Sequence, residues 1–262
     1  MPPFREPHRI RFERVANFRD LGGHTTREGT RVRRDQLFRS GHLGHASDAD
    51  IEQLAALGIQ RVFDFRTFAD IDSDGADRLP DGIRHHRLPM PDPAGGADLR
   101  SIILGTGPDE MAAVFGNGRA AAMMVDSAAD LVRERREAYA EFLTELARPG
   151  SLPALFHCSA GKDRAGWAGS LVLLALGVEE EQVVEQYLLS NQNLAGIRER
   201  LETADDAGWA EYLRPFLEVR REYIESSFAA VREGWGSFER SLAEGLAISD
   251  AQLAQLRESL LE

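Results

Sequence analysis

From residue 152 to residue 166 the chain reads LPALFHCSAGKDRAG, a strand, a loop and a helix start in one continuous stretch. Residues 152–157 form a short apolar run behind Pro149 and Gly150, which predicts a buried strand. Residues 165–176 are largely apolar and end before Gly177, which predicts a buried helix. The residues between them therefore form a loop at the N-terminus of a helix.

This loop contains the only cysteine and the only lysine of the chain, Cys158 and Lys162, and it ends in Arg164. Backbone N–H groups of such a loop can converge on a dianionic phosphate, and their field favours a thiolate at the cysteine. A planar guanidinium at Arg164 can hold two phosphate oxygens. The spacing is typical of enzymes that attack phosphate esters through a thiolate. The plainer alternative is a structural cysteine beside a surface arginine.

Four segments resemble the bacterial atypical tyrosine/lipid phosphatases, a family of the Cys-x5-Arg superfamily: residues 17–23 (NFRDLGG), 37–41 (LFRSG), 62–66 (VFDFR) and 157–166. The resemblance implies a protein tyrosine phosphatase-like α/β fold, with a mostly parallel central sheet flanked by helices and a C-terminal helical extension or lid. It also implies a cysteine-dependent protein tyrosine phosphatase, of tyrosine or dual specificity, that acts through a cysteinyl-phosphate. The lysine-containing loop resembles that of phosphoinositide 3-phosphatases as well, so phosphoinositide hydrolysis is the alternative main activity.

Within the loop, we expect Cys158 and Arg164 to be catalytic, and five neighbours to bind substrate: His157, Ser159, Ala160, Gly161 and Lys162. His157 in such loops more often orients the thiolate than carries a proton. Position 165 is Ala, where loops of this kind usually carry Ser or Thr, so turnover of the phosphoenzyme is expected to be slower. A weakly active phosphate-binding module is therefore kept as a further alternative.

Three aspartates compete for the role of general acid, which must protonate the leaving oxygen. Asp92 follows an expected strand, at a place that resembles the acid position of dual-specificity phosphatases. Asp163 lies inside the loop, and Asp64 ends another expected strand, next to the ligand crevice of an open α/β sheet. Structural roles are the alternatives: a turn residue at Asp92, a helix cap or ion pair at Asp163, and a partner for Arg66 at Asp64.

Neither a metal nor an organic cofactor is expected. The adjacent His85 and His86 would point to opposite faces of a strand, and no cysteine or carboxylate spacing completes a zinc set. An arsenate reductase would need further thiols. A sulfurtransferase would fit the lone cysteine but not the arginine six positions beyond it.

The chain of 262 residues predicts one phosphatase domain over residues 1–262, with a helical subdomain at about residues 178–245. Aromatic side chains between Trp209 and Phe238 predict a packed helical core there, or a lid over the site. A hairpin is expected between residues 14–21 and 31–39, and two further strands at residues 60–65 and 83–88. Helices are expected at residues 48–57, in a segment that ends at Leu146, and in a segment that starts at Ser249.

The longest apolar stretch, about residues 165–178, is too short to span a bilayer, and the N-terminus lacks a signal-peptide core. A single cysteine fits a reducing compartment. A cytoplasmic protein is expected, with export without a cleaved signal peptide left open.

The net charge is −12, but residues 1–40 contain ten arginines and five acids, a local charge of +5. Because the chain as a whole is strongly negative, nucleic acid is not an expected partner. The basic segment is expected to be a solvated surface, with peripheral contact to anionic lipid as the alternative. The expected partner is a phosphorylated protein or phosphoinositide substrate, and no stable protein partner is predicted.

Overall fold

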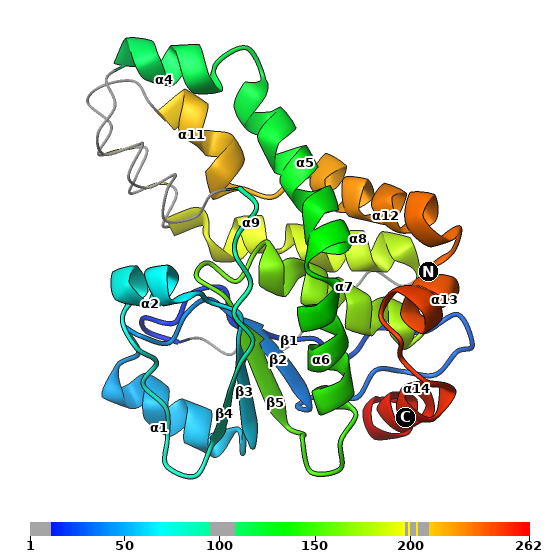
Figure 1. Ribbon diagram of the computed structural model, residues 1–262. Coiled ribbons are helices and arrows are strands. Elements are labelled where there is room, and N and C mark those ends of the chain that lie inside the picture. The colour runs from blue at the N-terminus through cyan, green and yellow to red at the C-terminus, as the bar shows by residue number, and fades with distance from the viewer. Residues whose placement is uncertain (1–11, 95–107, 197–198, 200–202, 204–209) are drawn as a thin grey trace.

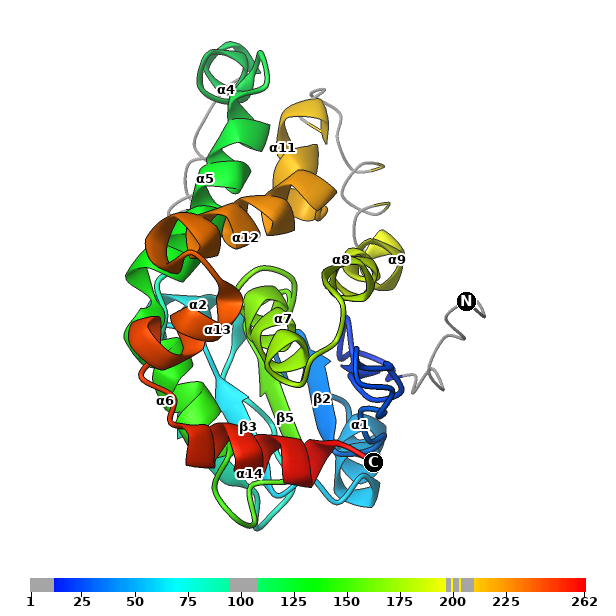
Figure 2. The same cartoon turned by 90° about the vertical axis from the view of Figure 1, so that its right-hand side faces the viewer.

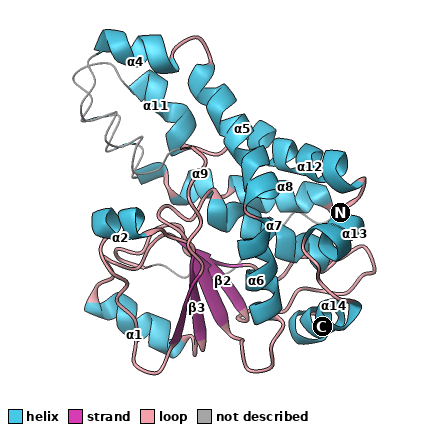
Figure 3. Cartoon of the chain, in the orientation of Figure 1, coloured by secondary structure: helices cyan, strands magenta, loops and turns pink. Residues whose placement is uncertain are grey.

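The computed structural model describes residues 12–94, 108–196 and 210–262, together with residues 199 and 203. Its centre is a five-stranded sheet in the order β1-β2-β5-β3-β4 (Figures 1 and 3). The strands are β1 (Arg19–Asp20), β2 (Leu37–Ser40), β3 (Arg61–Asp64), β4 (Arg84–Arg87) and β5 (Ala154–His157). Only the β1–β2 pair is antiparallel, so the carboxyl ends of the other four strands share one edge of the sheet.

Helices cover both faces of this sheet and rise above its carboxyl edge (Figures 1 and 2). They are α1 (Asp48–Ala56), α2 (Phe68–Asp74), α4 (Pro108–Phe115), α5 (Arg119–Glu134), α6 (Arg136–Leu146), α7 (Arg164–Ala175), α8 (Glu180–Leu188), α9 (Ser190–Asn193), α11 (Ala210–Leu217), α12 (Arg221–Trp235), α13 (Phe238–Arg240), the π-helix η1 (Ser241–Gly245) and α14 (Asp250–Leu260). The mixed α/β architecture expected from the sequence is thus present.

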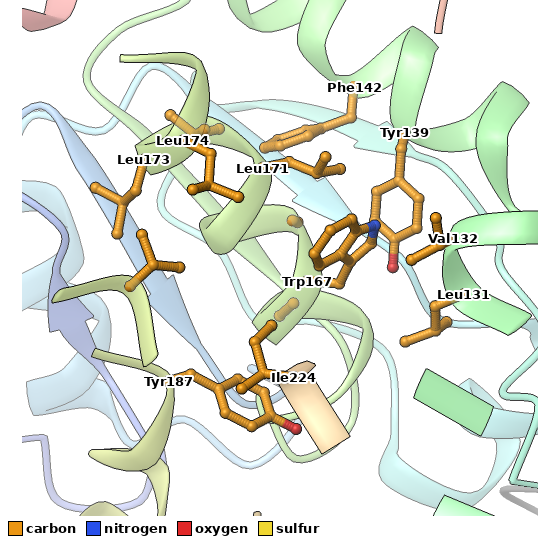
Figure 4. Close-up of a cluster of buried hydrophobic side chains, with 14 of the residues drawn as sticks. Leu131, Val132, Tyr139, Phe142, Trp167, Leu171, Leu173, Leu174, Tyr187 and Ile224 are labelled. Atoms are coloured by element: carbon orange, nitrogen blue, oxygen red, sulfur yellow. The ribbon is translucent and has the colours of Figure 1, made fainter. Parts of the chain in front are cut away.

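Alternation along the strands divides the apolar side chains between two cores, because neighbouring residues face opposite sides of a sheet. Phe38, Val62 and Leu155 pack under α1, together with Leu54. Phe156 joins the larger core on the other face. That core is centred on α7, whose residues are all buried, and Figure 4 shows side chains of several helices gathered around Trp167.

The predicted strands at 60–65, 83–88 and 152–157 and the helix at 165–176 are confirmed within one or two residues at their ends. Ser47 and Ser249 both close capping boxes, which fixes the starts of α1 and α14. The expected hairpin is shorter than predicted, with Arg19–Asp20 as its first strand. Nearer the turn, Val32 forms backbone hydrogen bonds with Gly23 and His24, while Arg31 exchanges two, of 2.9 Å, with Glu262.

The aromatic side chains of the C-terminal helices are mostly packed. Tyr223 and Phe228 on α12 are buried, and Phe216 on α11 is 8 % exposed. Trp209 lies outside the described residues. Core packing therefore accounts for this aromatic cluster, while the lid and the division into a helical subdomain remain predictions. Among the described residues, no helix is both long and apolar enough to cross a membrane.

Candidate active site

The loop between β5 and α7 follows the carboxyl end of β5. Because β5 is the middle strand of the sheet, the loop lies at the centre of the sheet's carboxyl edge. His157 is the last residue of β5, and α7 begins at Arg164. Between them Cys158 is only 3 % exposed. The strand–loop–helix junction predicted from the sequence is confirmed.

Carbonyl groups of the loop bind side chains of neighbouring strands. The Gly161 carbonyl accepts hydrogen bonds from Asn17 Nδ2 and Arg39 Nε, both at 2.9 Å. Asn17 also donates to the carbonyl of Ala160, at 3.1 Å. Gly161 has φ +69°, and a Cβ there would lie 2.2 Å from the Ser40 carbonyl oxygen. Glycine is therefore required at this position both by its backbone conformation and by the close approach of β2.

The environment of Cys158 differs from the thiolate-favouring field expected from the sequence. Burial raises the pKa of the Cys158 thiol, and the carboxylates of Asp163 and Asp92 add to the rise. The guanidinium of Arg164 and the backbone N–H of Ala165 oppose it and lower the pKa. Whether the thiolate forms therefore depends on the balance of positive and negative charge around Cys158.

The guanidinium of Arg164 is hydrogen-bonded strongly through one nitrogen, Nη1, and weakly or not at all through the other two. Its Nη1 donates to Asp70 Oδ2 at 2.7 Å and to the carbonyl of Met90 at 3.0 Å. Its Nε has no hydrogen-bond partner in the described part of the chain, and its Nη2 has only distant contacts there, with Ser159 Oγ at 3.5 Å and Asp92 Oδ2 at 3.7 Å. The Nε–Nη2 edge is therefore available to two oxygens of one phosphate group.

A cavity of about 190 Å³ opens above the loop. Met124 from α5 and Phe216 from α11 supply an apolar part of its wall. The other lining residues come from α2, from the segment after β4, and from the loop with the start of α7: Asp70, Ser73, Asp74, Asp92, Ala94, Cys158, Ser159, Ala160, Lys162, Asp163 and Arg164.

Two of the three candidate acids line this cavity. Asp92 Oδ2 lies 3.7 Å from Arg164 Nη2. Asp163 forms an ion pair with Lys162, at 2.8 Å. Burial, reinforced by Asp92, raises the pKa of Asp163 above its ordinary value, although Lys162 lowers it. Asp163 therefore keeps a proton to higher pH than an exposed carboxyl would.

Asp64, the third candidate, lies beneath the cavity and does not line it. Its Oδ1 and Oδ2 accept from Arg66 Nε and Nη2 at 3.0 and 3.1 Å. The structure thus gives Asp64 the ion-pair role that the sequence left open as its alternative.

His157 is fully buried and touches an aspartate that the sequence analysis did not single out. Its Nε2 lies 3.1 Å from Asp77 Oδ2, and its Nδ1 lies 3.2 Å from the Cys158 carbonyl oxygen. Burial lowers the pKa of His157, but Asp77 and Asp64 outweigh this effect and raise the pKa overall. An imidazole with a raised pKa directly before the cysteine fits the expected orienting role.

One cluster has the composition of a metal site: Asp64, Asp77, His85 and His157 each place a ligand atom within 4.8 Å of the others. Arg66 contacts both of its carboxylates, with Nη2 at 2.7 Å from Asp77 Oδ1. A guanidinium therefore already hydrogen-bonds both acids, and the metal-free site expected from the sequence stays a prediction.

Asp70 and Asp77 are the site residues that sequence reasoning missed. Asp70 had a local signal, because Thr67 and Asp70 form a capping box at the start of α2 directly after the β3 strand. Asp77 had none, since it follows α2 in an irregular segment and meets His157 only through the fold.

Comparison with known proteins matches residues 10–262 to the model of the tyrosine phosphatase family. A Cupriavidus necator protein named as a putative tyrosine-protein phosphatase is 35 % identical over 94 % of this chain and 87 % of its own. The triple specificity protein phosphatase PtpB of Mycobacterium tuberculosis is 30 % identical over 94 % and 96 %. The solved catalytic domain of the S. cerevisiae PP-IP phosphatase SIW14 overlaps 74 % of this chain and 91 % of its own, at 12 % identity and a TM-score of 0.35, too low to carry an argument. The first two relatives and the family model show that this chain belongs to the tyrosine phosphatase family.

Proposed function

We propose that this protein is a cysteine-dependent phosphatase that hydrolyses phosphate monoesters of tyrosine-phosphorylated proteins. The observation that carries the proposal is the Nε–Nη2 edge of Arg164, whose Nε has no hydrogen-bond partner among the described residues, at the same cavity that Cys158 and Arg164 line. A phosphate seated there would place its phosphorus over the sulfur and two oxygens on the guanidinium.

The reaction would proceed in two displacements. The Cys158 thiolate attacks phosphorus, an S–P bond forms, and the P–O bond to the leaving group breaks as an aspartic acid donates its proton to that oxygen. The resulting carboxylate then takes a proton from water, the hydroxide attacks phosphorus, and the S–P bond breaks to release phosphate and the thiolate. Arg164 and the loop amides hold the equatorial oxygens in both steps.

We propose Asp163 as the general acid, ahead of Asp92. A general acid must be protonated at the working pH, and the raised pKa of buried Asp163 supports that role. Asp70 also lines the cavity, but its contact with Arg164 lowers its pKa despite burial, so it is less suited to donating a proton.

The phosphoinositide alternative rests on Lys162, which lines the cavity and would meet further anionic groups of such a substrate. Its Nζ is paired with both carboxylate oxygens of Asp163, at 3.0 and 2.8 Å. A polyanionic substrate would have to compete with that ion pair. A phosphotyrosyl ester, with one phosphate and an apolar ring, would instead use the Met124–Phe216 wall.

The test is a panel of phosphotyrosine, phosphoserine and phosphothreonine peptides and phosphoinositides, assayed in EDTA with wild type and Cys158→Ser. We expect phosphotyrosine peptides to be hydrolysed at the highest kcat/KM, and the serine variant to bind phosphate without turnover. Turnover by Cys158→Ser would refute the covalent mechanism. A wild type that binds phosphate but hydrolyses nothing would leave only a phosphate-binding module.

A further inference from the structure

Two arginines lie buried side by side behind the loop. Arg19 on β1 and Arg39 on β2 are paired residues in the antiparallel register, and they are 6 % and 0 % exposed. Within the described part of the chain, neither forms an ion pair with a carboxylate. Two adjacent buried guanidinium groups without acidic partners are costly, so the surrounding structure must offset their charge.

Among the described residues, only neutral groups hydrogen-bond to the pair. Arg19 Nη1 donates to the carbonyl and Oδ1 of Asn17, at 3.1 and 2.5 Å. Arg39 Nη1 donates to Gln186 Oε1 at 3.1 Å, and Ser190 Oγ accepts from Nη2 of both arginines, at 3.0 and 3.2 Å. These groups add no negative charge, and Arg19 Nε has no hydrogen-bond partner in the described part of the chain.

The loop itself is the other partner of Arg39. Its Nε donates to the Gly161 carbonyl at 2.9 Å and its Nη2 to the Lys162 carbonyl at 3.2 Å. Burial lowers the pKa of Arg39 to about 10, so the side chain is still charged at neutral pH; Tyr187, Cys158 and Asp163 act in the opposite direction. Two of those three groups belong to the active site.

The cavity needs positive charge from outside its lining. With Asp163 protonated, as its proposed role of general acid requires, the lining contains three carboxylates, those of Asp70, Asp74 and Asp92, against the two cations Lys162 and Arg164, a formal charge of −1. Such a lining opposes both a thiolate and a dianionic phosphate. The two buried arginines behind the loop add two positive charges, which offset the charge of the lining and that of the Cys158 thiolate.

We propose that Arg19 and Arg39 form a buried cationic pair that favours the Cys158 thiolate and the bound phosphate dianion through the loop that lies between them and the cavity. Neither side chain reaches the cavity, so both are positioning residues. Arg39 also anchors the carbonyls of Gly161 and Lys162. The inference rests on the proposed function insofar as Cys158 is the nucleophile.

Other charged or titratable groups around Cys158 must be held constant in a test. They are His157 on β5, Arg164 and Asp163 at the start of α7, Asp92 beyond β4 and Tyr139 on α6. The pair can be changed without touching any of them, since its hydrogen-bond partners in the described part of the chain are Asn17, Gln186, Ser190 and loop carbonyls.

The experiment measures alkylation of Cys158 by iodoacetamide as a function of pH, in wild type, Arg39→Gln, Arg39→Lys and Arg19→Gln. A neutral reagent reports thiolate formation without sensing the charge of the variant. We expect Arg39→Gln to raise the alkylation midpoint by about one pH unit or more, the effect typical of one nearby opposite charge. Arg39→Lys should restore most of the shift, and Arg19→Gln should give a smaller rise, because Arg19 donates to no loop carbonyl.

The same samples report phosphate affinity through protection of Cys158 from alkylation by inorganic phosphate. We expect about tenfold weaker protection in Arg39→Gln, measured at the same thiolate fraction. The matched control is Arg61→Gln: Arg61 is a buried arginine of β3 in the same sheet, but it is paired with Glu145 at 2.6 Å. That variant should lose stability without moving the midpoint.

Unchanged midpoints in Arg39→Gln and Arg19→Gln, with native circular dichroism, would overturn the inference. If Arg39→Gln does not fold, Arg19→Gln and Arg39→Lys decide it: an unchanged midpoint in Arg19→Gln then overturns the proposal. Neither readout needs turnover. If the arginine variants shift the alkylation midpoint but the wild type hydrolyses no ester, the proposed function alone is refuted. If the wild type is active and the variants leave the midpoint unchanged, this inference alone is refuted.

Discussion

Removing the carboxylate of Asp70 should release Arg164 while leaving the phosphate loop in place. The ion pair between Asp70 Oδ2 and Arg164 Nη1 is 2.7 Å long, and the two side chains are 8 % and 2 % exposed. In Asp70→Ala, Arg164 keeps the carbonyls of Met90 and Phe65, at 3.0 and 3.4 Å. The guanidinium would then remain in the site but lose the contact that aims it.

The expected loss of stability can be bounded from these contacts. Breaking a buried ion pair by removing one partner costs about 3–5 kcal/mol. Because two carbonyls still satisfy Nη1, we take the lower end, about 3 kcal/mol, which includes the Thr67 capping box that the variant also loses. For a chain of this size that corresponds to a fall in Tm of roughly 6–12 °C. Asp70→Asn keeps an oxygen for the cap and should lose less.

The assay is kcat/KM for a phosphotyrosine peptide at a temperature where all variants are folded. We expect a loss of about tenfold or more in Asp70→Ala, because a misaimed oxyanion donor costs less than a missing one. Asp72→Asn is the control, since Asp72 is exposed on the same helix. If Asp70→Ala stays within twofold of wild type while Asp72→Asn does too, Arg164 does not depend on Asp70 for its aim.

Three further predictions concern pH, the general acid and the loop. Arg164 lowers the pKa of Asp70 against the opposing effect of burial. The stabilising contribution of Asp70 is therefore present above the ordinary carboxyl pKa of about 4 and is lost as pH falls through the folded-state value. The Tm gap between wild type and Asp70→Asn should close in acid, and a constant gap would contradict the pairing. Asp163→Asn should abolish the alkaline limb of the kcat profile and harm poor leaving groups more than p-nitrophenyl phosphate, whereas the same pattern in Asp92→Asn would reverse our assignment. Gly161→Ala should cost about 2 kcal/mol or more in chemical denaturation, because its φ of +69° disfavours a Cβ and Ser40 leaves no room for one; near-native stability would show that the loop can move away from β2.

Local sequence determined the core of this site because the necessary signals are short-range. Apolar residues 152–157 and 165–176 specify a strand and a helix, and Cys158 and Arg164 lie within the loop that joins them. Capping boxes at Ser47 and Ser249 likewise fix helix starts from four residues each. These features depend on hydrogen bonds and periodicity within one segment.

The tertiary structure decided which residues surround that loop. Asp70 meets Arg164 across 94 positions of sequence, and Arg39 meets Gly161 across 122. Asp64 ends a strand beside the site, as Asp92 follows another, yet only Asp92 lines the cavity, because Arg66 occupies both oxygens of Asp64. Such outcomes follow from strand order, register and the competition between partners for the same charged atoms, none of which is encoded in a local pattern.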